Sequence, residues 1–158
     1  MKDASIGLGA KLALALGAGL VGATVMLLSQ KTEMWATGRG PSMVPAKAAE
    51  TLTGVTLYDP ADEARLSTAA HFAFGTTLGL GVALLDRAPA AARAPLFAAG
   101  AWGAGNAIMT ALGACEPPTR WSRQALAIDL LHHAVYGAAT AGAYAEATRL
   151  IEARSARG

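Results

Sequence analysis

The chain has 158 residues; 53% are hydrophobic, only 15% are charged, and the formal net charge is +2. Soluble domains carry roughly 25% charge and disorder needs high charge with low hydrophobicity, so the composition argues against both. A lone cysteine, Cys115, excludes a disulfide framework, and the small, evenly spread charge predicts no nucleic-acid partner. The length is that of one domain over residues 1–158, and the composition favours a small membrane protein.

Four long segments of the chain are almost free of charge. They are residues 12–30, 66–85, 94–115 and 124–145, with Asp129 as the only interruption. A helix rises about 1.5 Å per residue and the hydrocarbon core is about 30 Å thick, so about 20 residues cross it. The sequence therefore predicts an all-α fold, an integral membrane four-helix bundle that forms a single transmembrane domain. Its expected spans are residues 8–30, 66–86, 94–115 and 124–146.

The first apolar segment is expected to be a retained helix. A signal peptide has an apolar region of roughly 7–15 residues and a cleavage site with small residues. Here the segment is longer and leads into Leu27–Lys31, which lacks that site.

The connections also carry signals. Pro41 to Pro45 break the chain after the first span, and residues 46–53 predict a short helix that Gly54 stops. Asp59 and Pro60 are typical of an N-cap and first helical position, so the second helix is expected to begin there. Residues 116–120 separate the third helix from the fourth.

Four spans put both termini on one side of the membrane. That side carries seven basic residues: Lys2, Lys11, Arg87, Arg93, Arg149, Arg154 and Arg157. The other side carries six: Lys31, Arg39, Lys47, Arg65, Arg120 and Arg123. The positive-inside rule therefore favours cytoplasmic termini by a small margin.

The second and fourth spans share a short pattern, His71-Phe-Ala-Phe-Gly75 and His133-Ala-Val-Tyr-Gly137. The first and third share a weaker one, which begins at Gly22 and at Gly105. The order suggests two duplicated helical hairpins as parallel repeats. Small residues let helices approach closely in lipid, so helix-packing roles are predicted for Gly22, Gly75, Gly79, Gly105 and Gly137. This packing occurs within one chain, at a homodimer or partner face, or at both.

A polar cluster lies at membrane depth in the fourth span. Asp129 is three residues before His132 and four before His133, so either imidazole can reach the carboxylate on a helix. A carboxylate in hydrocarbon needs a partner or water, so the cluster is either a satisfied polar patch or a proton or ion site. His71 and His133 are expected to face the bundle interior without haem. A lesser alternative is bis-histidine haem ligation by these two residues.

No enzyme motif occurs in the sequence, so no catalytic residue is predicted. Three suitable zinc ligands on separate helices are not evident, and no metal or cofactor is expected. The leading interpretation is a non-enzymatic membrane protein with an interaction or structural role. Its partners would be the lipid bilayer and either itself or another membrane protein. The alternative is an oligomeric transporter or channel for protons, ions or small solutes that uses Asp129, His132 and His133.

The stretch from Ala111 to Trp121, followed by Asp129 to Gly137, resembles the YagU-like small bacterial inner-membrane proteins. Shared features are the proline-containing first loop at Pro41 to Pro45, His71 near the start of the second helix, and the His-x-x-Tyr-Gly pattern from His133. The resemblance covers most of the chain. It implies a multi-pass inner-membrane protein of four helices and no firm activity.

Overall fold

The computed structural model describes residues 6–157, which form five α-helices, two 3₁₀ segments and no strand. The helices are α1 (Leu8–Thr37), α2 (Val44–Thr53), α3 (Pro60–Leu78), α4 (Ala90–Ala111) and α5 (Arg123–Ser155). The 3₁₀ segments are η1 (Gly79–Leu85), which continues α3, and η2 (Pro118–Arg120). The all-α prediction is confirmed. The count of four helices is wrong, because the short helix expected after the first span forms as a fifth, α2.

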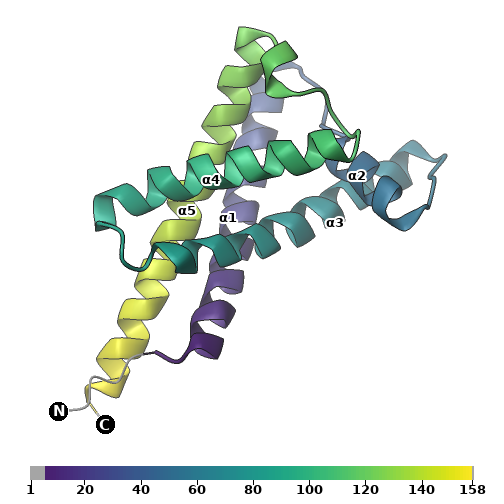
Figure 1. The fold of residues 1–158 in the computed structure, drawn as a ribbon. Helices are drawn as coiled ribbons and strands as arrows, with labels where there is room; N and C mark the ends of the chain where they lie inside the picture. The colour runs from purple at the N-terminus through teal and green to yellow at the C-terminus, as the bar shows by residue number, and fades with distance from the viewer. Residues whose placement is uncertain (1–5, 158) are drawn as a thin grey trace.

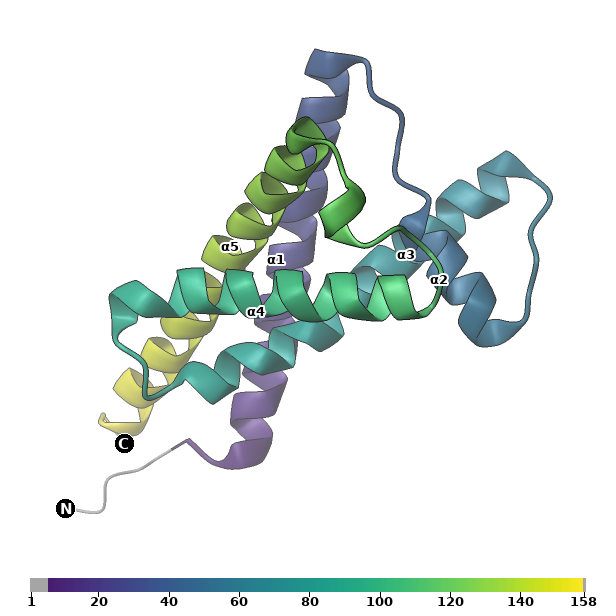
Figure 2. The same ribbon diagram turned by 45° about the horizontal axis from the view of Figure 1, so that its top comes forward.

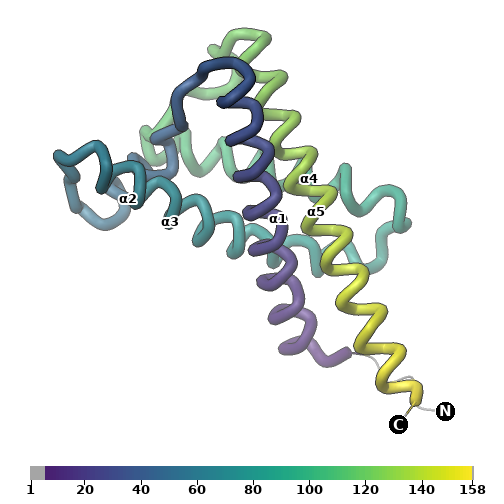
Figure 3. The backbone as a smooth tube through the Cα atoms, turned by 180° about the vertical axis from the view of Figure 1, so that it is seen from behind, coloured from purple at the N-terminus to yellow at the C-terminus, as the bar shows by residue number. Residues whose placement is uncertain are grey.

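The long helices lie in two crossed layers. In the first layer, α1 and α5 run antiparallel, so the start of α1 and the end of α5 lie at the same end of the pair (Figure 1). In the second layer, α3 with η1 and α4 run across that pair (Figure 2). Seen from behind, α1 and α5 pass in front of the second layer (Figure 3). The short α2 packs against α3.

Local sequence signals set the helix ends. The Asp59 side chain accepts a hydrogen bond of 2.7 Å from the backbone nitrogen of Ala61, and Pro60 occupies the first turn of α3 as predicted. Ser122 caps α5 in the same way. Gly38 ends α1 with a φ of 71°, a backbone conformation that residues with a side chain rarely adopt.

The helices extend beyond the predicted spans, because a helix does not end where charge begins. The first span was expected to end at residue 30, but α1 continues through Lys31 and Glu33 to Thr37. Likewise α5 continues past residue 146 to Ser155. Of the basic residues counted for orientation, Lys2 lies outside the described residues.

Two segments of the described chain are long and apolar enough to cross a membrane, Leu8–Thr37 and Pro60–Leu85. The four-span prediction is not confirmed on this measure. The reason lies in composition: α4 carries Arg93, Pro95 and Asn106 besides its glycines, which lower its mean hydropathy, and α5 carries Asp129 and two histidines.

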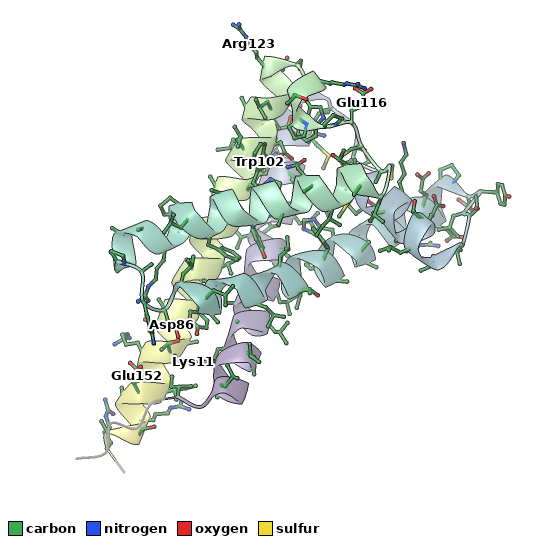
Figure 4. The ribbon with its side chains drawn as sticks, viewed as in Figure 1. Lys11, Asp86, Trp102, Glu116, Arg123 and Glu152 are labelled. Carbon is green, nitrogen blue, oxygen red and sulfur yellow. The ribbon has the colours of Figure 1, made fainter. Side chains whose placement is uncertain are left out.

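The core lies where the two layers cross, and small residues dominate it. Its buried members include Ala15, Ala18, Val82, Phe97 and Tyr136. At the end of α1 nearest the N-terminus, Lys11 forms an ion pair with Asp86, in the link between η1 and α4. This pair and its place near the lower end of α5 are visible in Figure 4.

Candidate functional site

His132 joins α5 to α1. Its side chain is almost fully buried, and its Nδ1 atom lies 2.9 Å from the hydroxyl oxygen of Ser29. The other ring nitrogen, Nε2, lies 3.8 Å from a carboxylate oxygen of Glu33 and has no hydrogen-bond partner among the described residues. Arg39 binds the same carboxylate of Glu33 with hydrogen bonds as short as 2.6 Å. On the α1 side of the fold, His132 thus lies beside a carboxylate whose charge is balanced by Arg39.

Asp129 joins α5 to α4, and His133 bonds back to Asp129 within α5. The indole nitrogen of Trp102 donates a hydrogen bond of 2.8 Å to Oδ2 of Asp129. Nδ1 of His133 lies 2.9 Å from the backbone carbonyl of Asp129 and 3.5 Å from Oδ2 of the same residue. Both of these partners accept hydrogen bonds, so the proton of a neutral His133 belongs on Nδ1 and its Nε2 is an acceptor.

His71 joins α3 to α1. Its Nε2 atom lies 3.0 Å from the backbone carbonyl of Ala23, which fixes a proton on Nε2. One turn further along α3, the backbone carbonyl of Gly75 accepts a hydrogen bond of 2.6 Å from the hydroxyl of Tyr136 in α5. Four of these polar side chains therefore tie two helices together, as polar side chains do in membrane helix bundles: those of His71, Asp129, His132 and Tyr136.

The four polar residues singled out by the sequence meet at one cavity. It has a volume of about 1180 Å³, and all five helices contribute to its wall. Asp129, His132 and His133 line it from α5, and His71 lines it from α3. Most of the remaining wall is apolar, including Met26, Leu27, Leu78, Met109 and Ile128. A large apolar cavity with a few converging polar groups is the usual form of a ligand site.

The structure divides the predicted cluster more sharply than the sequence did. Residues on a helix point in different directions, so His132 contacts α1, Asp129 contacts α4, and His133 bonds back to Asp129. The partners Ser29, Glu33 and Trp102 were not predicted from the sequence. Ser29 and Glu33 stand four residues apart on α1, a spacing that places them on one face and was available as a signal.

Four of the five glycines with predicted packing roles lie at very close contacts. A Cβ atom added to Gly75 would lie 2.8 Å from Cβ of Ala23, and one added to Gly79 would lie 2.5 Å from Cα of Gly19. At Gly22 it would overlap the hydroxyl of Thr140. The fourth, Gly137, packs against Ala98. Gly105 differs, because its nearest neighbour, Phe74, would lie at an ordinary 3.6 Å.

These contacts show that the two hairpins pack in different registers. Gly75 of α3 packs on Ala23 of α1, whereas Gly137 of α5 packs on Ala98 of α4. Alignment of the proposed repeat pairs Ala23 with Asn106, roughly two helical turns from Ala98. The shared sequence pattern therefore does not produce the same helix contact in both halves.

Comparison of the chain with family models, with curated proteins and with solved structures gave no match.

Proposed function

We propose that this chain is a multi-pass bacterial inner-membrane protein that acts without catalysis, by associating with a second copy or with another membrane protein. The uncovered apolar surface of its helices carries the proposal. On α1, Leu8 is 73% exposed and Leu28 is 59% exposed, with Leu12, Leu16 and Leu20 between them. Only 33% of the most apolar stretch of α1 and 11% of that in Pro60–Leu85 is buried. Exposure of such apolar faces to water is unfavourable, whereas lipid chains cover them without a cost in free energy.

Association is supported by a face of α4 that is left uncovered by the other helices of residues 6–157. Gly103, Ala107 and Ala111 follow one another at four-residue spacing and are all exposed. A hollow of about 430 Å³ runs along this face, between these residues and Pro117 and Pro118. Small residues at this spacing allow two membrane helices to approach closely.

Membrane integration is tested by extraction with alkaline carbonate. The expressed protein should stay with the membrane pellet, while a peripheral control protein is released. Recovery of the chain in the supernatant would contradict the proposal.

Association is tested by Gly103→Ile. Beyond its own turn of helix, no atom of the described residues lies within 4 Å of the added Cβ at Gly103, so the fold should tolerate the change. The matched control is Gly17→Ile on α1, since Gly17 is also exposed and has equally open surroundings. In vesicles that hold donor-labelled and acceptor-labelled copies at low density, fluorescence energy transfer between copies should fall for Gly103→Ile and stay unchanged for Gly17→Ile. If copies of the wild-type protein show no energy transfer, a pull-down that compares the wild type with Gly103→Ile decides whether a different protein binds this face. Retention of both interactions in Gly103→Ile would exclude this face.

A transporter or channel for protons or small solutes is the second candidate. The observation in its favour is that Asp129, His132 and His133 line one cavity together with His71. Polar residues in a membrane protein frequently mark such a pathway. Proton and cation flux into proteoliposomes tests it. Flux that Asp129→Asn abolishes would make transport the leading function, and absence of flux would remove it.

A further inference from the structure

We propose that the cavity binds a lipophilic organic ammonium ion, that is, a protonated amine carried on an apolar body. The proposal rests on the second candidate function, because it uses the same cavity, and it names the class of solute that a transporter or channel would carry. It requires binding alone, so it is measured separately from flux and from association.

The polar wall of the cavity offers acceptors. Asn106 uses its side-chain nitrogen to donate to the backbone carbonyl of Trp102, which leaves its side-chain oxygen as an acceptor. Asp129 takes the Trp102 indole on Oδ2, and no described residue donates to Oδ1. His133 holds its proton on Nδ1, which leaves Nε2 as an acceptor. All three residues line the cavity. Asn106 and Asp129 both bond to Trp102, and His133 bonds to Asp129. An ammonium group, with three donors and no acceptor, complements them.

The charges of the cavity favour a cation. Arg39 lines it, but its guanidinium is bound to the carboxylate of Glu33. Glu116 and Arg120 also line it, are both exposed, and carry opposite charges. Asp129 is less exposed, with 29% of its side chain accessible, and its charge is met there by a neutral indole donor. A cation placed beside this carboxylate gains a charge-assisted hydrogen bond.

The apolar wall fits the body of such a ligand. Phe74, Tyr136 and Trp121 line the same cavity, and aromatic faces attract organic cations. The volume of about 1180 Å³ exceeds the roughly 300 Å³ lower bound of ordinary ligand pockets. The cavity therefore has room for an apolar body of several rings or for an alkyl chain.

Three fluorescent probes with one body and different head groups test the proposal. The probes are dansylcadaverine, which carries an amine, its N-acetyl derivative, which is neutral, and dansyl-6-aminohexanoate, which is anionic. Each is titrated against the full chain in nanodiscs of net-neutral phosphatidylcholine, and protein-free nanodiscs are subtracted. We expect the amine to bind at least tenfold more tightly than either analogue. Equal affinity for the three probes, or no binding of the amine, would overturn the proposal.

Asp129→Asn should remove the amine preference and bring the three affinities within about twofold, because the amide keeps an oxygen for Trp102 but loses the charge. Glu152→Gln is the matched control, since it makes the same charge change near the far end of α5, away from the cavity (Figure 4). It should keep the preference. A preference that survives Asp129→Asn would refute the assigned site. If that variant does not fold, the wild-type comparison decides alone.

Discussion

The Nδ1 atom of His132 lies 2.9 Å from the hydroxyl oxygen of Ser29, and this contact joins the two antiparallel helices of the first layer, α5 and α1. The imidazole is only 2% exposed, so water does not replace a lost partner. Removal of the Ser29 hydroxyl would leave both ring nitrogens of His132 without a hydrogen bond from the described residues. The contact therefore has an energetic consequence that can be measured.

We expect Ser29→Ala to lower the free energy of unfolding by about 0.6 kcal/mol and by no more than about 1.7 kcal/mol, the average and the maximum found for hydrogen bonds between membrane helices. Reversible unfolding in mixed micelles provides the measurement. Thr32→Ala is the control, because the Thr32 hydroxyl bonds within its own helix to the carbonyl of Leu28 and is exposed. An equal loss in the two variants would show that the contact with His132 adds nothing.

Gly22→Ala should destabilise the fold by about 1–3 kcal/mol, since an added methyl group would overlap the Thr140 hydroxyl and press on the ring of Tyr136 at 2.9 Å. Thr140→Ala in the same chain should recover part of the loss, because it removes the overlapping oxygen. Gly17→Ala serves as control. Outside the surrounding turn of α1, the part of the chain that the structure describes has no atom within 4 Å of the new methyl group, so the better helix propensity of alanine should leave stability unchanged or raised. Equal effects at the two glycines would contradict this account of α1 packing on α5.

Trp102→Phe should cost about 1.5–3 kcal/mol of stability, because the Asp129 carboxylate loses its indole donor. The comparison is Trp35→Phe, made at a tryptophan that is 87% exposed, where we expect a change within about 0.5 kcal/mol. The same mixed-micelle unfolding measures both. A Trp102→Phe chain as stable as the wild type would mean that water or another donor satisfies Asp129.

The sequence was informative where a signal is local. Asp59 with Pro60 predicted the start of α3, and Gly54 predicted the end of α2, because caps depend on a few adjacent residues. The extension of α1 to Thr37 was missed, although Gly38 marked it, because the charge-free run was used as the boundary. The change to a 3₁₀ helix at Gly79 was not foreseen either.

The sequence predicted which residues of α3 and α5 belong to the site, but it did not predict their partners on other helices. The pairing of Asp129 with His133 follows from helical spacing and is present. The pairings of His132 with Ser29, of Asp129 with Trp102 and of His71 with Ala23 join distant parts of the chain. They depend on how the two layers cross, which is decided by close contacts such as that between Gly19 and Gly79. No periodicity within one helix encodes that choice.

Accessibility of single cysteines should distinguish four membrane crossings from two. In a Cys115→Ser background, Ala90→Cys, Thr119→Cys and Ser155→Cys each place a thiol at an exposed position. The ion pair of Lys11 with Asp86 holds the link before α4 beside the start of α1, so position 90 should label from the same side as position 155. Labelling with a membrane-impermeant maleimide in right-side-out and inside-out vesicles gives the measurement.

Position 119 is the one that decides. If all four long segments cross, it should label from the side opposite to positions 90 and 155. If only Leu8–Thr37 and Pro60–Leu85 cross, as their length and composition allow, α4 and α5 stay on one side and all three positions label together. The greater number of basic residues on the side of positions 90 and 155 predicts that this side is cytoplasmic. We expect opposite labelling of position 119, because the exposed leucines at 130 and 131 of α5 and at 96 of α4 need lipid to cover them.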